Sequence, residues 1–81
     1  MIRIKFFAYL RETLGVSEME LDGQDGQTIA AIKQALVEKG SPWDMLDEQD
    51  VLFALNQAIC GDDAIVNSGD ELAFFPPVTG G

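Results

Sequence analysis

Histidine is absent from the 81-residue chain, and Cys60 is its only cysteine. The chain therefore lacks the commonest general base and a common zinc ligand. A single thiol cannot form an internal disulfide, a redox-active cysteine pair or a four-cysteine iron–sulfur site. We interpret Cys60, which follows an apolar residue, as a small buried side chain. The sequence predicts no metal site.

Positively charged side chains are scarce. Five lysine and arginine residues stand against 14 aspartate and glutamate residues, which gives a net charge of −9. A phosphate backbone would repel such a surface, so we expect no direct binding to nucleic acid. The acidity suits a protein partner with a basic surface, although a role in solubility alone would explain it equally well.

Long apolar runs are also missing. Arg3 and Lys5 interrupt the first ten residues, which argues against a signal peptide, and no segment approaches the length of a membrane span. With no disulfide possible, we expect a cytoplasmic protein with no membrane partner. Hydrophobic residues still make up 47% of the chain, enough for a globular core. One domain of this size has little room for a closed active site, which favours a carrier, binding module or subunit.

The periodicity predicts a strand at the start of the chain, with its even positions buried: Ile2, Ile4, Phe6 and Ala8 alternate with Arg3, Lys5, Phe7 and Tyr9. A short helical turn over residues 10–14 is expected to close at Gly15. Met19 and Leu21 alternate with acidic residues and indicate a second strand. The glycine-rich tract 22–26 is typical of a loop.

A helix is predicted to begin after Thr28, because Ile29, Ile32 and Leu36 follow helical spacing and Thr28 is a suitable N-cap. Gly40 is the expected C-cap, and Pro42 prevents the helix from continuing.

The segment 41–50 is acidic and carries Asp44, Asp47, Glu48 and Asp50. Their spacing does not match the calcium-binding loop, so we interpret the segment as a solvated loop attached to the core by Trp43 and Leu46.

The remaining strands are expected at residues 51–55, 58–60 and 71–75, with a turn at Asn56-Gln57 and a loop over residues 62–69. The order strand, strand, helix, strand, short strand, strand predicts an α+β fold of the β-grasp type, a mixed sheet with one main helix packed across it. We expect the domain to span residues 1–75 and an extended, flexible tail to span residues 76–81.

The tail carries the chemistry. Pro76 and Pro77 end the last strand and hold the exit extended, because proline cannot donate to a sheet ladder. Gly80 and Gly81 have no side chains, so they can thread a narrow channel and deliver the terminal carboxylate. Adenylylation by ATP would make that carboxylate electrophilic. A sulfur nucleophile would then displace AMP and leave a thiocarboxylate on Gly81, whereas a lysine would form an isopeptide bond.

An exposed aromatic patch is predicted beside the tail. If even positions of the first strand are buried, Phe7 points outward; if Leu72 and Phe74 point inward, Phe75 is also exposed. The first and last strands are neighbours in a β-grasp sheet, so Phe7 and Phe75 would form one partner-binding surface. Arg11 is expected at its rim.

Three segments carry a close resemblance to a known family: Met1–Ala8, the Arg11-Glu12 pair and Phe74–Gly81. They resemble the small subunits of molybdopterin synthases, which are ubiquitin-like sulfur carriers. The terminal motif Phe-Phe-Pro-Pro-Val-Thr-Gly-Gly is its most specific part.

The resemblance implies a set of partners and no bound cofactor. An E1-like enzyme would use ATP to adenylate Gly81, and a persulfide-bearing desulfurase or similar donor would supply sulfur. The tail would enter the large synthase subunit, in a heterotetramer of two small and two large subunits, and donate sulfur to cyclic pyranopterin monophosphate to build the dithiolene of molybdopterin. The partner-binding positions implied by the family are Phe7, Arg11, Ile59, Phe75, Pro76, Pro77, Val78 and Thr79.

Other functions use the same activated carboxyl group. The chain could carry sulfur for thiamine synthesis or tRNA thiolation, or act as a ubiquitin-like protein modifier. A plain interaction domain with an inert tail is a further alternative. The terminal motif favours the molybdopterin pathway, and a stand-alone enzyme is disfavoured by the absence of histidine, a metal motif and a phosphate loop.

Overall fold

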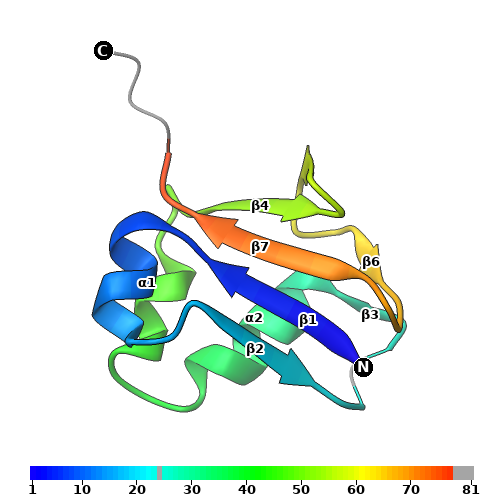
Figure 1. Ribbon diagram of the computed structural model, residues 1–81, viewed down its shortest axis with the longest axis horizontal. Helices are drawn as coiled ribbons and strands as arrows, with labels where there is room; N and C mark the ends of the chain where they lie inside the picture. The colour runs from blue at the N-terminus through cyan, green and yellow to red at the C-terminus, as the bar shows by residue number, and fades with distance from the viewer. Residues whose placement is uncertain (24, 78–81) are drawn as a thin grey trace.

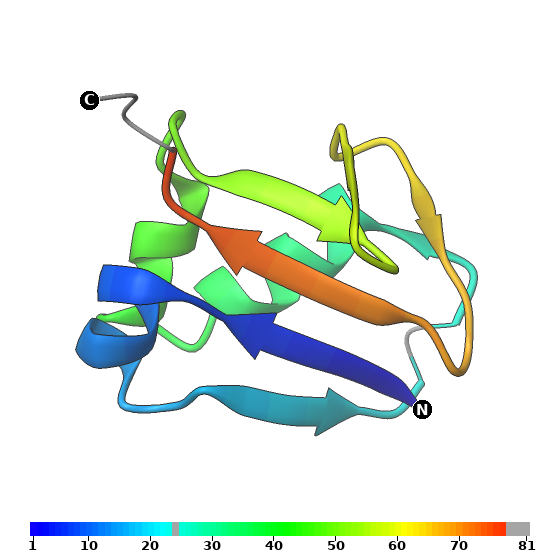
Figure 2. The same cartoon turned by 45° about the horizontal axis from the view of Figure 1, so that its top comes forward.

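The computed structural model describes residues 1–23 and 25–77. Five strands form one mixed sheet in the order β2-β1-β7-β4-β5. β1 runs parallel to β7, and the other neighbouring strands are antiparallel. Figures 1 and 2 show the first and last strands side by side, with the main helix behind the sheet and the first helix beside one end of it. This arrangement confirms the predicted α+β, β-grasp architecture. The strands are β1 (Ile2–Phe6), β2 (Glu18–Leu21), β4 (Leu52–Leu55), β5 (Ala58–Cys60) and β7 (Glu71–Phe75).

The main helix, α2 (Ile29–Val37), begins as the sequence predicts. The backbone N–H of Ala31 donates to Oγ1 of Thr28 at 3.1 Å, so Thr28 caps the first turn. Ile29, Ile32 and Leu36 are fully buried against the sheet. The end of the helix differs from the prediction. Its C-cap is Glu38, and Gly40 follows with a positive φ of 88°, a conformation that glycine adopts without strain.

The core lies between α2 and the inner face of the sheet. Ile2, Ile4 and Phe6 of β1 are buried, as the alternation predicts. The Phe6 ring stacks on Phe74 of β7 with centroids 5.7 Å apart, and Trp43 meets the same ring edge-on at 5.7 Å. Trp43 begins a short 3₁₀ helix, η1 (Trp43–Asp47), which also buries Leu46. The acidic segment is therefore attached to the core by the two expected side chains.

The first strand ends earlier than expected. Ala8 continues the alternating pattern in sequence, but the structure places it at the start of α1 (Ala8–Leu14), exposed and with a φ of 54°. Phe7 makes the last bond to β7, from its N–H to the Phe74 carbonyl at 3.2 Å, and the positive φ of Ala8 then turns the chain away from the sheet. α1 ends at Gly15, whose φ of 72° fits the predicted closure.

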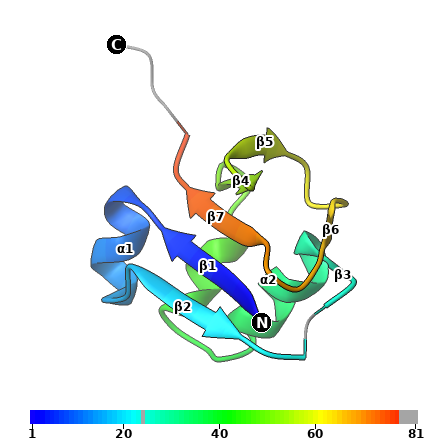
Figure 3. The same ribbon diagram turned by 45° about the vertical axis from the view of Figure 1, so that its right-hand side comes forward.

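The predicted loop over residues 62–69 contains a short strand. β6 (Ile65–Val66) pairs with β3 (Gln27–Thr28) to form a separate two-stranded sheet, visible at the right of Figure 3. Two residues are too few for hydrophobic periodicity to reveal a strand. This small sheet connects the start of α2 to the segment that leads into β7.

The β4–β5 hairpin turns at Asn56 and Gln57, whose φ values of 51° and 70° are typical of a two-residue hairpin turn. Asn56 also ties the hairpin to β7. Its Oδ1 accepts the backbone N–H of Glu71 at 3.0 Å, and its Nδ2 donates to Oδ1 of Asp70 at 3.1 Å. These two bonds fix the β4–β5 turn to the start of β7.

Candidate protein-docking interface

The outer face of the sheet changes character from one edge to the other. Lys5 of β1 lies opposite Glu18 on β2 and opposite Ala73 on β7. Ala73 in turn lies opposite Ala54 on β4, which lies opposite Ile59 on β5. Residues in register share a face, so this single row runs from charged side chains at the β2 edge to apolar ones at the β5 edge.

A depression with a volume of about 450 Å³ lies in this face, next to the end of β7. Four of its lining residues are apolar or aromatic and three are polar. They are Phe7, Ala54, Ala73, Phe75, Lys5, Gln57 and Glu71. Apolar walls with a few polar groups are the usual composition of a binding site on a protein surface.

Phe7 and Phe75 come together as predicted and line the same depression. Phe7 is 44% exposed. Phe75 faces outward but is half-buried rather than exposed, which corrects the sequence-based expectation. The reason is its register: Phe75 lies directly opposite Leu52 of β4, and the turn after β1 places Phe7 on its other side.

Two other predicted interface residues lie outside the depression. Ile59 is 74% exposed and sits beside it, opposite the lining residue Ala54. Arg11 is an exposed residue of α1, one helical turn after Phe7, and does not line the depression. Ile59 therefore extends the apolar surface formed by Phe7 and Phe75 across β4 to β5.

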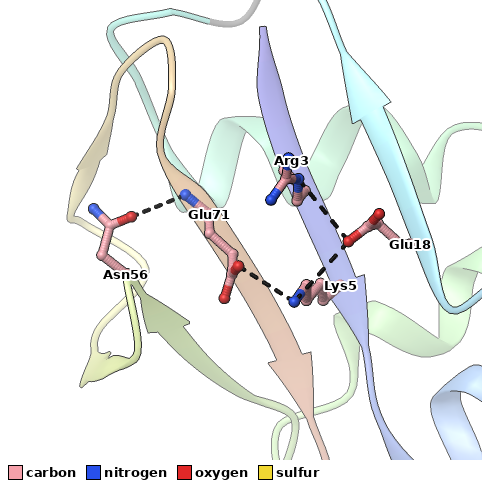
Figure 4. A network of polar contacts seen from close by, with 5 residues as sticks. All are labelled: Arg3, Lys5, Glu18, Asn56 and Glu71. Atoms are coloured by element: carbon pink, nitrogen blue, oxygen red, sulfur yellow. Dashed lines mark hydrogen bonds and ion pairs between the residues drawn. The ribbon is translucent and has the colours of Figure 1, made fainter.

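Sequence reasoning missed the polar lining residues. The ammonium group of Lys5 lies 3.4 Å from a carboxylate oxygen of Glu71 and 4.0 Å from one of Glu18. Arg3 approaches the same Glu18 oxygen at 3.9 Å. Figure 4 shows Lys5 between the two carboxylates. These contacts depend on which residues face each other across β2, β1 and β7, a register that local sequence does not give.

Two titratable groups on the described surface have altered acidity. Partial desolvation, followed by the charges of Asp50 and Glu48, raises the pKa of Tyr9 above 10.0, so its hydroxyl stays neutral at physiological pH. Hydrogen bonds from the backbone of Asn67 and the side chain of Asn56 lower the pKa of Asp70 below 3.8. Neither group lines the depression, so neither supplies an acid or base there.

The predicted reactive end of the chain is not part of this geometry. Val78, Thr79, Gly80 and Gly81 lie outside the described residues. Pro76 and Pro77 are described, are half-buried and follow β7 directly without strand structure. Within residues 1–23 and 25–77, no cluster of three or more histidine, cysteine, aspartate or glutamate side chains could hold a metal ion. None of the helices in this part of the chain is long and apolar enough to cross a membrane.

Comparison with known proteins identifies the family. Residues 4–81 match the ThiS family. The chain is 42% identical to the molybdopterin synthase sulfur carrier subunit of Haemophilus influenzae and 39% identical to that of Escherichia coli, in both cases over the full length of each chain.

Solved structures agree on the fold. The putative molybdopterin converting factor subunit 1 from Pyrococcus furiosus superposes with a TM-score of 0.79 at 25% identity, covering 95% of this chain and 97% of the other. The small archaeal modifier protein 1 of Haloferax volcanii gives 0.77 at 26%, with the same coverage. One chain of the complex of subunits 1 and 2 of molybdopterin-converting factor from Helicobacter pylori is similar in fold, with a TM-score of 0.69 at 20% identity over 99% of this chain and 97% of that chain. The chain therefore belongs to the ThiS family, among the molybdopterin synthase sulfur carrier subunits.

Proposed function

We propose that this chain is the sulfur carrier subunit of a molybdopterin synthase and that it carries the sulfur on the C-terminal carboxyl group of Gly81. The observation that carries the proposal is the apolar depression between Phe7 and Phe75, located where β7 ends and the tail begins. The full-length similarity of the chain to sulfur carrier subunits of molybdopterin synthase supports the same function.

The position of the depression explains how a carrier without catalytic groups can work. A partner that binds at Phe75 holds the root of the tail. The six residues from Pro76 to Gly81 can then reach about 20 Å when extended. The partner's active site supplies the catalytic groups, and this chain supplies a docking face and a carboxylate.

The chemistry would proceed in two stages. An E1-like enzyme transfers the adenylyl group of ATP to the Gly81 carboxylate and releases pyrophosphate. A persulfide then attacks the acyl carbon and AMP leaves, which gives an acyl disulfide. A thiol cleaves its S–S bond, releases the thiocarboxylate and becomes the second half of a new disulfide with the donor cysteine. The ionised sulfur of the thiocarboxylate is a good nucleophile, as a thiolate is. After docking on the large synthase subunit, that sulfur would pass to cyclic pyranopterin monophosphate.

Two partners would therefore use the chain in turn. Both need the same carboxyl group, so the discharged carrier leaves the large subunit and returns to the activating enzyme for each of the two sulfur atoms of a dithiolene. The complex of two subunits of molybdopterin-converting factor from Helicobacter pylori supports a large-subunit partner. We place the reaction in the cytoplasm, with a persulfide-bearing desulfurase as sulfur donor.

Intact-protein mass spectrometry tests the proposal. The chain is incubated with ATP, the E1-like enzyme from the same organism and a sulfur source. We expect a mass gain equal to the replacement of one oxygen by sulfur, localised to the C-terminal peptide. The activating enzyme is first shown to thiocarboxylate another carrier. If the mass of this chain then stays unchanged after incubation with that enzyme, the proposal is contradicted.

A second function is favoured by one observation, the similarity to the small archaeal modifier protein 1 of Haloferax volcanii. A modifier would form an isopeptide bond between Gly81 and a lysine of another protein. The same mass spectrometry, applied to a cell extract that contains tagged chain, distinguishes them: a modifier gives branched glycine–lysine peptides, and a dedicated sulfur carrier gives the thiocarboxylate alone.

A further inference from the structure

We propose that Lys5 and Glu71 act as a docking pair: Lys5 neutralises Glu71 inside the depression, so that an apolar face of the large synthase subunit can cover both. This inference rests on the proposed function and concerns the same docking face. It assigns a role to two residues that the interface predictions from the sequence did not include.

The geometry places the pair within the surface to be covered. Both residues line the depression together with Phe7 and Phe75. The Lys5 ammonium and the Glu71 carboxylate are 3.4 Å apart, and their side chains retain only 35% and 23% of their exposure. Ala73, the register partner of Lys5, contributes only a methyl group between the two residues of the pair. Figure 4 shows the Lys5 side chain directed toward the Glu71 carboxylate.

The backbone of Glu71 is also fixed. Its N–H donates to Oδ1 of Asn56 at 3.0 Å, and its carbonyl accepts from the backbone N–H of Asn56 at 2.8 Å. Because both polar groups of its main chain are held, the backbone of Glu71 stays in place when a partner approaches. The side chain therefore continues to start from the floor of the depression, where Lys5 is its ion-pair partner.

The charge distribution sets this face apart from the rest of the chain. The outer face of β2, β1 and β7 carries two positive side chains, Arg3 and Lys5, which ion-pair with Glu18 and Glu71. The chain as a whole carries a net charge of −9. Glu20, opposite Arg3 on β2, leaves the β2 edge negative. By contrast, Lys5 neutralises Glu71 within the depression.

Covering an ion pair has a different cost from covering a lone carboxylate. A pair that stays intact keeps its mutual attraction when water leaves, whereas removal of one partner leaves an uncompensated charge in the interface. Phe7, Phe75, Ala54 and Ala73 surround the pair with apolar surface, so the matching partner face is apolar at this point. The acidic remainder of the chain attracts the partner's basic regions from a distance.

A double-mutant cycle on binding tests this directly. The large synthase subunit from the same organism is titrated with wild-type chain, Lys5→Met, Glu71→Gln and the double variant, and the dissociation constants are measured by calorimetry. We expect Lys5→Met to weaken binding by at least about tenfold, which corresponds to about 1.4 kcal/mol. The double variant should bind within about threefold of wild type, because the uncompensated charge is gone.

Arg3→Met is the matched control. It removes one positive charge from the same strand and the same face, but Arg3 does not line the depression. A change of less than about threefold is expected, since a partly exposed ion pair outside the covered surface contributes little. Thermal unfolding of each variant, followed by circular dichroism, establishes that the titrated protein is folded.

The outcomes separate this inference from the proposed function. Loss of affinity in Lys5→Met together with recovery in the double variant supports the pair. Additive effects of the two substitutions, or equal losses in Lys5→Met and Arg3→Met, would overturn it while leaving the carrier function in place. A wild-type chain that fails to bind the large subunit would overturn both.

Discussion

The backbone N–H of Phe7 donates to the carbonyl of Phe74 at 3.2 Å, and this bond closes the parallel pairing of the first and last strands. It brings the side chain that follows β1 next to the side chain that ends β7. Phe7 and Phe75 therefore line one depression although they are far apart in the sequence. The proposed docking face and the start of the tail that follows β7 are built by the same contact.

The neighbouring residues Phe74 and Phe75 should respond in opposite ways to replacement by alanine. Phe74 is fully buried, so Phe74→Ala should lower the free energy of unfolding by about 3–5 kcal/mol. Phe75 faces the depression, so Phe75→Ala should cost less stability but weaken binding to the large subunit by about 30-fold. Urea unfolding and calorimetric titration measure the two effects.

Ile65→Ala is the matched control for binding. Ile65 is 49% exposed on β6, in the other sheet, so its loss should leave affinity for the large subunit within about twofold. An affinity unchanged in Phe75→Ala would show that the depression is not the docking site.

Extension of the chain by one alanine after Gly81 should abolish thiocarboxylate formation. The acyl carbon that must be adenylated would then belong to the added residue, whose methyl group does not fit a channel made for glycine. The melting temperature should not change, because β7 ends six residues before the terminus. Mass spectrometry after incubation with the activating enzyme measures the loss, and full activity of the extended chain would refute a terminal-carboxylate mechanism.

Thr28→Ala should reduce the free energy of unfolding by about 1 kcal/mol, because the backbone N–H of Ala31 loses its acceptor. For a domain of this size that corresponds to a fall in melting temperature of about 4–8 °C. Thr28→Ser keeps the hydroxyl and should lie much closer to wild type. Equal losses in the two variants would mean that the methyl group, rather than the cap, is responsible.

Asp70 should make stability depend on acid pH. Its folded-state pKa lies below the ordinary value of 3.8, so its ionised form stabilises the folded state above that pH, and this contribution is lost as the pH falls below 3.8 toward the folded-state pKa. Asp70→Asn should therefore be less stable than wild type at neutral pH, and the difference should narrow at about pH 3. Urea unfolding of wild type and Asp70→Asn at neutral pH and at about pH 3 measures this difference in the free energy of unfolding.

Asp44→Asn serves as a control for the loss of one charge, since Asp44 is exposed on η1. A gap between wild type and Asp70→Asn that stays constant across this range would exclude the carboxylate as the cause.

Much of the fold follows from local patterns in the sequence. The alternation of Ile2, Ile4 and Phe6 predicted β1, and Thr28 marked the start of α2. The pattern failed at Ala8, because period-two spacing does not reveal where the backbone turns away from the sheet. It also missed β6, whose two residues are held by pairing with a distant segment.

The candidate site was predictable only in its aromatic part. Phe7 and Phe75 could be placed on the outer face by counting along each strand. The half-burial of Phe75 depends on Leu52, and the Lys5–Glu71 pair depends on the offset between β1 and β7. Register between strands at opposite ends of a chain is set by the assembled sheet and by the hydrophobic core beneath it.

The adjacency of β1 and β7 also governs when the protein can fold during its synthesis. β1 has only β2 as a partner nearby in the sequence, while its other neighbour, β7, is translated much later than either of them. Ribosomes add about 5–20 residues per second, and closure of such a distant strand pair waits for that last segment. A nascent chain that stalls before β7 cannot assemble Phe7 and Phe75 into a recognisable surface.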